Sequence, residues 1–187
     1  RVGTTGYATL ANLQELYAAG HDIGNHSKTH TDFRTLTQAE IEAELSSCST
    51  YLIDNGMPRA AKHVAYPFGG ADADTYAAME ASAMLSGRAT NAGYITFDDI
   101  HNSAYGVYKL PVAIYVRNTT VNEVKTAIYN ARINNEMAII LFHKISDGGT
   151  EYETSIADFT EIINYILAST RALTVTQWYD EYATLYL

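Results

Sequence analysis

Short apolar runs alternate with segments of helical periodicity along most of this chain. Residues 137–142 form the clearest run, and its nearly continuous apolar character is typical of a strand buried on both faces of a parallel sheet. Residues 110–116, rich in β-branched side chains, predict a second strand, and a helix that begins at Thr119 or Thr120 lies between the two. This order of strand, helix and strand restricts the chain to the α/β class.

The rest of the chain repeats this alternation. Capping residues predict helix starts at Thr9, Thr37, Asp72, Ser155 and Thr176. Extended segments are expected at residues 20–25, 63–66, 90–97 and 173–175. Periodicity permits both a doubly wound sheet and a barrel, and it does not choose between them. No linker or low-complexity stretch interrupts the pattern, so we expect a single domain over residues 1–187.

The charge balance argues against one class of partner. The chain has 12 Lys and Arg residues against 21 Asp and Glu residues, and its formal net charge of -9 repels the phosphate backbone of a nucleic acid. No apolar run approaches the length of a membrane span, and a hydrophobic fraction of 47% indicates a folded, globular chain. Cys48 is the one cysteine, so no intrachain disulfide can form, and we expect it to be a small core residue of a helix.

Two histidines four residues apart, His26 and His30, are the strongest candidates for chemistry. Side chains with this spacing on a helical turn lie on one face, so both imidazoles can reach a single cation such as zinc. The strand expected at residues 20–25 places them at its carboxyl end, where α/β barrels carry their active sites. The alternative is a pair of solvated loop histidines, since imidazole is common at protein surfaces.

The letters around these histidines resemble a known family. Residues 22–30 (DIGNHSKTH) resemble the second motif of the polysaccharide deacetylases, the NodB homology domain of family-four carbohydrate esterases. Residues 65–69 (AYPFG) resemble the third motif of that family, and residues 141–143 (LFH) resemble the last. The three motifs follow the order of the family and span most of the chain. The resemblance implies a distorted (β/α) barrel of the NodB type.

The resemblance also implies a mechanism and a set of catalytic roles. His26 and His30 would bind a divalent metal ion, zinc first, with cobalt, nickel, manganese or iron as alternatives. His143 would be the general acid, because imidazole titrates near neutral pH. A backbone N–H, that of Phe68, would donate a hydrogen bond to the oxyanion.

The implied activity is hydrolysis of acetyl groups on a polysaccharide. Tyr66, Pro67 and Phe68 would form one wall of the substrate groove, and Leu141 would line the pocket for the acetyl methyl group. N-acetylglucosamine polymers, such as peptidoglycan, chitin-like or exopolysaccharide chains, are the expected substrates, which makes the enzyme a hydrolase of carbon–nitrogen bonds other than peptide bonds. An O-acetyl xylan esterase and a noncatalytic glycan-binding relic are the alternatives. A secreted or cell-surface location is expected.

Two departures from the family pattern affect the catalytic aspartates. Ala65 occupies the place of the family's arginine, so the group that orients the base must come from elsewhere. The Asp-Asp pair of the first motif should precede His26, and it does not. Asp98 and Asp99 spell a similar pair after the third motif, and we interpret them as turn residues.

The simplest interpretation is a chain that lacks the first strand and helix of the domain, together with the Asp-Asp pair. With His26 and His30 as its two protein ligands, such a chain is expected to bind zinc weakly and to turn over little substrate by itself. Uncovered strand edges would favour association with another copy or with the missing N-terminal segment.

The remaining histidines match no motif of the family. His63 and His101 are expected to be structural or exposed, and His21 is expected to be a strand-end residue and not a third metal ligand. Asp22, next to His21, is a candidate for hydrogen bonds that orient the metal ligands.

Overall fold

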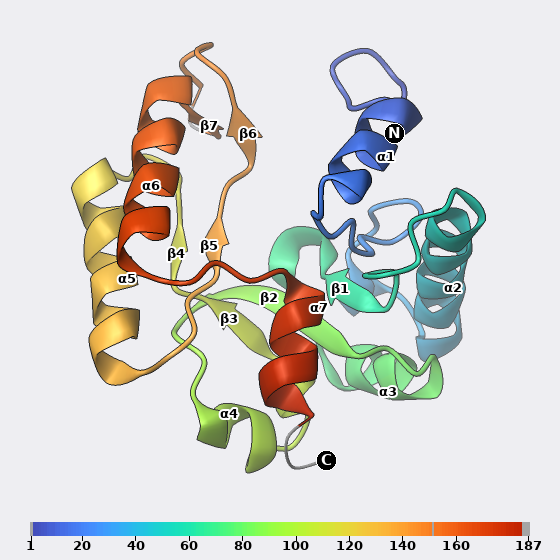
Figure 1. The fold of residues 1–187 in the computed structure, drawn as a ribbon. Helices are drawn as coiled ribbons and strands as arrows, with labels where there is room; N and C mark the ends of the chain where they lie inside the picture. The colour runs from blue at the N-terminus through green and yellow to red at the C-terminus, as the bar shows by residue number, and fades with distance from the viewer. Residues whose placement is uncertain (1, 151, 185–187) are drawn as a thin grey trace. The chain divides into compact units, whose positions relative to one another are not determined.

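A computed structural model describes residues 2–150 and 152–184 of the chain. The chain divides into two compact units. Among the described residues, unit 1 comprises 2–88, 107–109 and 173–184, and unit 2 comprises 89–106, 110–150 and 152–172. The expected single domain over residues 1–187 stays a prediction. Figure 1 shows the elements of both units.

Unit 1 is rich in helices. Its helical elements are α1 (Leu10–Ala18), η1 (Phe33–Thr35), α2 (Gln38–Asp54), η2 (Pro67–Gly69), α3 (Ala73–Ala81), α7 (Val175–Trp178) and η4 (Tyr179–Ala183). The predicted caps Thr9, Thr37 and Asp72 are confirmed. The last helix is capped by Thr174, whose hydroxyl accepts from the backbone N–H of Gln177. The prediction of a strand at 173–175 followed by a cap at Thr176 is therefore wrong, because the helix begins one residue after Thr174.

The sheet of unit 1 is small and parallel. Strand β1 (His63–Ala65) pairs in parallel with the first three residues of β2 (Ser86–Ala92). The strand predicted at 20–25 is reduced to one bridge between Asn25 and Val64. One reason is that the carbonyl of His21 accepts a hydrogen bond from a guanidinium group and not from a neighbouring strand. The extended segment predicted at 90–97 overlaps only the end of strand β2, which spans Ser86–Ala92. Residue 97 already begins a helix.

Helices α2 and α3 pack against each other beside β1 (Figure 1). A core cluster of Leu52, Met57 and Ala61 receives partly buried side chains from α1, residue 23 and α2, which are Leu10, Leu13, Tyr17, Ile23 and Cys48. Cys48 lies in α2 as predicted, but it is half-buried and packs against the core cluster instead of belonging to it. This packing fixes α2 as a rigid support for the segment that follows residue 24.

Unit 2 alternates short strands with two long helices. Its elements are α4 (Phe97–His101), β3 (Leu110–Val112), β4 (Ile114–Tyr115), α5 (Val121–Asn134), β5 (Ile140–Leu141), β6 (Lys144–Ile145), β7 (Glu153–Thr154) and α6 (Ile156–Ser169). A turn η3 (Gly106–Tyr108) precedes β3, which lies next to β2 in the sheet order β1-β2-β3. The pairs β4-β5 and β6-β7 are parallel. Thr120 and Ser155 cap α5 and α6, as predicted.

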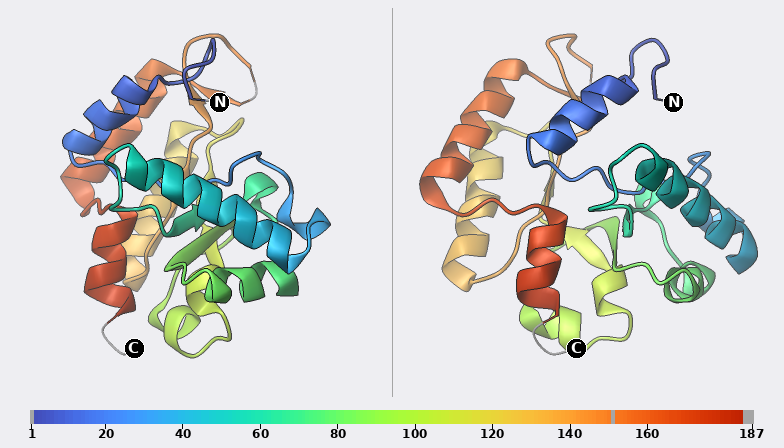
Figure 2. Two further views of the ribbon diagram at one scale, coloured as in Figure 1. Left: turned by 90° about the vertical axis from the view of Figure 1, so that its right-hand side faces the viewer. Right: turned by 45° about the vertical axis from the view of Figure 1, so that its right-hand side comes forward.

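The core of unit 2 lies under α5 and α6, which are side by side in Figure 2. Val116, Val124, Ile128 and Ile162 form this core, and Ile140 and Phe142 pack against it. The prediction that residues 137–142 are buried on both faces is wrong, because all six are only half-buried. Ile140 and Phe142 lie two residues apart and thus on one face, whereas their neighbours are not part of the cluster. Parallel strands and helices still alternate, so the predicted α/β class is confirmed.

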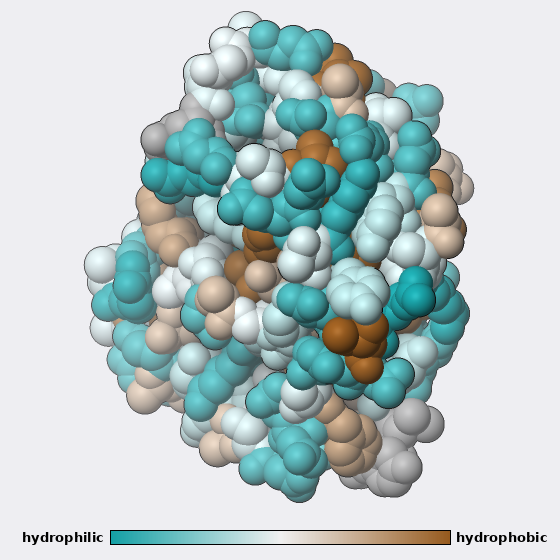
Figure 3. All heavy atoms as spheres, turned by 90° about the vertical axis from the view of Figure 1, so that its left-hand side faces the viewer, coloured by the Kyte–Doolittle hydropathy of each residue, from teal (hydrophilic) through white to brown (hydrophobic). Residues whose placement is uncertain are grey.

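The surface over α5 and α6 is mostly polar. Figure 3 shows this side of the molecule, where hydrophobic residues form separate patches among hydrophilic ones. Ile133 and Leu167, on α5 and α6, are among the exposed apolar side chains. Within the described part of the chain, the helices are too short or too polar to cross a bilayer.

Candidate functional site

Asn25 anchors the loop that carries the two histidines. Its backbone N–H donates to the carbonyl of His63 at 2.8 Å, and its carbonyl accepts from Ala65 at 2.9 Å. Its buried amide donates to the carbonyl of Leu45 and to Ser49 Oγ, both at 2.9 Å, and its Oδ1 accepts from the N–H of Ser27 at 2.9 Å. The loop therefore starts from a fully hydrogen-bonded residue held between β1 and α2.

The ring of His26 is oriented by a backbone carbonyl. Its Nδ1 lies 2.6 Å from the carbonyl oxygen of Ala65. Because a carbonyl can only accept, this contact assigns the proton of the neutral ring to Nδ1 and the lone pair to Nε2. A ring nitrogen bonded in this way to a backbone carbonyl is the usual arrangement of a histidine that binds metal through its other nitrogen.

The rings of His26 and His30 lie together, although not on a helical turn. Their centroids are 4.8 Å apart, with an interplanar angle of 79°. Residues 26–30 form an irregular loop in which Ser27 and His30 have positive φ angles of 65° and 63°. The backbone N–H of His30 donates to Ser27 Oγ at 2.9 Å, which closes the turn. The predicted convergence is thus reached through left-handed backbone conformations and not through helical geometry.

A glutamate of α2 holds the middle of this loop. Glu44 Oε2 accepts from the backbone N–H groups of Lys28 at 2.9 Å and Thr29 at 2.7 Å. Its Oε1 accepts from the Thr29 hydroxyl at 3.0 Å. Both carboxylate oxygens therefore contact the segment between the two histidines, a role that no motif in the sequence indicates.

The segment that resembles the third motif lies against the same loop. Phe68 has a φ angle of 56° and is 66% exposed, and its ring centroid is 4.9 Å from that of His30. Tyr66 and Pro67 are buried, and the Tyr66 hydroxyl donates to the carbonyl of Tyr108 at 2.8 Å. Burial raises the pKa of the Tyr66 phenol far above its usual range. Of the three residues predicted to form the groove wall in this segment, Phe68 is exposed to solvent and the other two are buried.

The two imidazoles fit part of a metal site. They supply two nitrogen donors, whereas a catalytic zinc ion normally takes three protein ligands. Among residues 2–150 and 152–184, no group of three or more His, Cys, Asp or Glu side chains is placed to hold a metal ion. The predicted metal ligands His26 and His30 stay a prediction, supported by their proximity and by the Ala65 contact.

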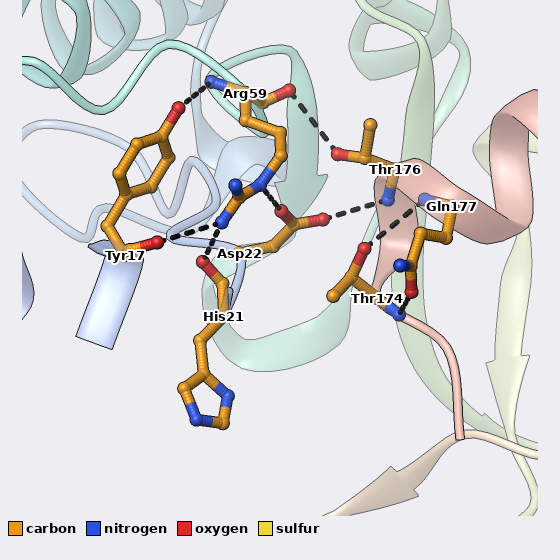
Figure 4. Close-up of polar contacts among 7 residues, drawn as sticks. All are labelled: Tyr17, His21, Asp22, Arg59, Thr174, Thr176 and Gln177. Carbon is orange, nitrogen blue, oxygen red and sulfur yellow. Dashed lines mark hydrogen bonds and ion pairs between the residues drawn. The ribbon is translucent and has the colours of Figure 1, made fainter. Parts of the chain in front are cut away.

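Asp22, the candidate for orienting the metal ligands, bonds an arginine and a backbone N–H of the last helix (Figure 4). Its carboxylate accepts from Arg59 Nε at 2.6 Å and from the backbone N–H of Thr176 at 2.8 Å. The same guanidinium bonds the carbonyls of Tyr17 and His21 and lies over the Tyr17 ring, 4.2 Å from its centroid. Burial favours a higher pKa for Asp22, but the Thr176 and Arg59 bonds outweigh it and lower the pKa.

Two of the histidines outside the motifs have structural surroundings. His63 is buried, its Nδ1 lies 2.8 Å from Ser86 Oγ, and burial lowers its pKa. His101 ends α4, and its ring lies 4.2 Å from that of Phe97. His21 is exposed, and in Figure 4 its ring points away from Arg59 while its carbonyl faces it. The expectation that His63 and His101 are structural or exposed is confirmed. His21 is not a strand-end residue, because residues 21–24 form no strand.

Asp98 and Asp99 serve the start of a helix. Asp99 Oδ2 accepts from the backbone N–H and the hydroxyl of Thr96, at 2.9 and 2.7 Å. Asp98 Oδ1 accepts from the side-chain amide of Asn102 at 2.9 Å. They lie in the first turn of α4, so the interpretation of Asp98 and Asp99 as turn residues is wrong.

The residues of the last motif belong to unit 2. Leu141 is half-buried in β5, where it pairs with Tyr115 of β4. His143 follows the strand and is exposed, with its ring centroid 5.5 Å from that of Tyr152. The predicted roles of Leu141 in the acetyl pocket and of His143 as general acid stay predictions.

Comparison with known proteins identifies the family that this chain resembles. Residues 3–84, which contain both loop histidines and residues 65–69, match the family model described as polysaccharide deacetylase. The predicted resemblance to these enzymes is therefore confirmed.

Two solved structures have a similar fold. One is the deacetylase PplD of Streptococcus pyogenes in complex with acetate, with a TM-score of 0.51 and 20% identity over 58% of this chain and 45% of that chain. The other is a family 4 carbohydrate esterase from Streptomyces lividans in complex with acetate, with a TM-score of 0.51 and 16% identity over 88% of this chain and 76% of that chain. The matched part of this chain thus spans less than half the length of PplD. At these identities the likeness concerns the fold.

Proposed function

We propose that this chain removes acetyl groups from a polysaccharide by metal-assisted hydrolysis, with His26 and His30 as two of the metal ligands. The observation that carries the proposal is the pair of exposed imidazoles 4.8 Å apart, inside the stretch that matches the deacetylase family. The hydrogen bond from His26 Nδ1 to the Ala65 carbonyl supports it further, because it leaves the lone pair of Nε2 available to bind a metal ion. The architecture proposed with this function is the distorted (β/α) barrel of the NodB type.

The metal ion and the residues around it would perform separate tasks in this reaction. A divalent ion, zinc in the first place, would polarise the acetyl carbonyl and lower the pKa of a water molecule when bound. The Ala65 carbonyl keeps the Nδ1 proton of His26 in place, and the backbone N–H of Phe68 is the proposed donor to the oxyanion. His143 is the proposed general acid, which would protonate the leaving group.

The proposed substrate is a polymer of N-acetylglucosamine. The Phe68 ring is exposed beside His30 and offers an apolar face on which a sugar ring can stack. Acetyl esters of xylan are the alternative substrate, because ester and amide hydrolysis pass through the same kind of oxyanion. A noncatalytic glycan-binding role is a second candidate, favoured by the two-ligand donor set within the described residues.

Zinc binding by single-histidine variants tests the proposal. His26→Ala should weaken zinc binding by more than the roughly 100-fold expected for losing an outer hydrogen-bond partner, because it removes a ligand itself. His21→Ala is the matched control, since His21 is an exposed histidine whose ring points away from its polar neighbours. Competition with a chromophoric chelator measures the affinity. Equal zinc affinity in the two variants would contradict the metal site.

Acetate release separates the candidate functions. The chain should release acetate from chitooligosaccharides in a zinc-dependent reaction that His26→Ala abolishes. Release from acetylated xylan instead would indicate the esterase. Binding of both oligosaccharides without acetate release, by wild type and His26→Ala alike, would favour the noncatalytic role.

A further inference from the structure

We propose that Glu44 positions the His26–His30 pair for metal binding, an inference that rests on the proposed function. Glu44 lies 16 and 15 residues from the two backbone N–H groups that it accepts from, those of Lys28 and Thr29. These two amides belong to the residues immediately before His30. A single side chain of α2 thus fixes the orientation of the peptide groups that connect the two imidazoles.

The loop requires such support because its backbone is strained. Ser27 and His30 have φ angles of 65° and 63°, a region that residues other than glycine enter at an energetic cost. Such conformations persist when surrounding contacts hold them. Hydrogen bonds to a carboxylate are shorter and stronger than bonds between neutral groups, and the bonds to Lys28 and Thr29 measure 2.9 and 2.7 Å. Without them, the exposed amides would turn to water and the backbone at His30 could relax.

Helix α2 is suited to this role because it is itself held firmly. Ile41 and Leu45, which flank Glu44 on the helix, are completely buried. The carbonyl of Leu45 accepts from the Asn25 amide, so consecutive residues of one helical turn hold the start and the middle of the loop. The relative position of the two imidazoles is therefore set by α2 as much as by the loop sequence.

Metal affinity of the full chain, measured with Zn²⁺ and with Co²⁺ as a spectroscopic probe, tests this role. Glu44→Ala should weaken binding by about 10- to 100-fold, the range for groups that orient metal ligands. Glu44→Gln should recover most of the affinity, because its amide oxygen can accept from the two N–H groups while its NH₂ donates to the Thr29 hydroxyl. The Co²⁺ visible spectrum should change in Glu44→Ala and return towards that of wild type in Glu44→Gln.

Glu42→Ala is the matched control. Glu42 is also a half-buried glutamate of α2, but its carboxylate accepts from Gln38 of the same helix. This variant should keep the wild-type zinc affinity and Co²⁺ spectrum. Amide hydrogen exchange provides a readout without metal, in which Glu44→Ala should lose protection at Lys28 and Thr29 while Glu42→Ala keeps it.

Each result bears on the inference. Wild-type affinity in Glu44→Ala would overturn it, and so would an equal loss in Glu42→Ala, which would indicate a general effect on α2. If wild type and Glu42→Ala bind no zinc, the proposed function itself fails and the inference fails with it. If Glu44→Ala does not fold, Glu44→Asp decides, because its shorter side chain should weaken zinc binding if reach to the loop matters, and unchanged affinity would overturn the inference.

Discussion

Two stretches that are close in the sequence, residues 17–22 and 25–30, differ in which of their polar groups are buried. In the first, the charged groups are the most enclosed: the Asp22 side chain is 8% exposed and that of its partner Arg59 is 33% exposed. In the second, a neutral amide, that of Asn25, is buried, while the titratable imidazoles of His26 and His30 are exposed. The first stretch thus encloses a paired carboxylate, whereas the second exposes two imidazoles on a loop that the buried Asn25 anchors.

This difference has a measurable consequence. Contacts of the first stretch join segments of unit 1 that are far apart in the sequence, so their loss should affect mainly the stability of the fold. Contacts of the second stretch join the histidine loop to α2 and β1, so their loss should affect mainly metal binding. Stability and zinc affinity should therefore respond to different substitutions.

The largest effect on stability is expected for Asp22→Ala. The substitution leaves the Arg59 guanidinium without its carboxylate, and breaking a buried ion pair costs about 3–5 kcal/mol. We expect the lower end of that range, because Arg59 is one third exposed and keeps the carbonyls of Tyr17 and His21. Zinc affinity should stay near that of wild type. Urea unfolding and zinc competition measure the two quantities.

Asp54→Ala is the control for this prediction. Asp54 is an exposed aspartate at the end of α2, so its removal should leave stability within about 0.5 kcal/mol of wild type. If Asp22→Ala lost more free energy of zinc binding than free energy of unfolding, the proposal that the two stretches serve different purposes would be contradicted.

A smaller loss of stability, with a clear loss of zinc affinity, is expected for Asn25→Ala. The substitution removes the bonds of the Asn25 side chain to the Leu45 carbonyl, Ser49 Oγ and the Ser27 N–H, and a lost hydrogen bond typically costs about 0.5–1.5 kcal/mol. The backbone bonds of residue 25 to His63 and Ala65 remain possible, so β1 should keep its place. If zinc affinity were retained while stability fell, the loop would not depend on this anchor.

The smallest effect is the pH dependence of stability, to which His63, the backbone partner of Asn25, and Asp22 should contribute in different pH windows. His63, whose carbonyl accepts from Asn25, has its pKa lowered below 6.5 by burial, against the opposing influence of Asp22 and Asp180. Below pH 6.5 the unfolded chain therefore binds a proton that the native protein resists, and the free energy of unfolding should fall as the pH falls. His63→Gln should lose this part of the slope, whereas His21→Gln should keep it.

Asp22 acts in a separate, more acidic window. Its pKa in the folded chain is below 3.8, so its stabilising contribution is present above pH 3.8 and is lost as the pH falls through the lower, folded value. Asp22→Asn should remove this acid dependence and leave the one near pH 6.5. Urea unfolding at a series of pH values measures both, and a single common transition would contradict the assignment.

The helix starts could be predicted from the sequence because capping is a local interaction. Thr9, Asp72, Thr120 and Ser155 each accept from an N–H three residues ahead, so the signal lies within a few letters. Strands depend on partners elsewhere, and their predicted limits were less accurate. Residues 20–25 have β character but form a bridge only at Asn25, since the carbonyl of His21 bonds a side chain.

The candidate site was predicted in part for the same reason. The HxxxH spacing and the motif letters located His26, His30 and Phe68, which the structure brings together. The spacing also suggested a helical turn, whereas the loop uses left-handed residues that only the contacts with α2 explain. Glu44 lies in the middle of a well-patterned helix, and no local signal distinguishes it from Glu42.

The contact between Asp22 and Thr176 has a consequence for how the chain folds as it is synthesised. Arg59 can meet Asp22 early, but Thr176, which donates to the carbonyl of Arg59 as well, lies 117 residues further along. At about 5–20 residues per second, ribosomes need roughly 6–23 s to make that stretch. During that time all of unit 2 is synthesised, and the Asp22 oxygen that later accepts from Thr176 is hydrated. The first part of unit 1 is thus completed by residues that are synthesised after unit 2.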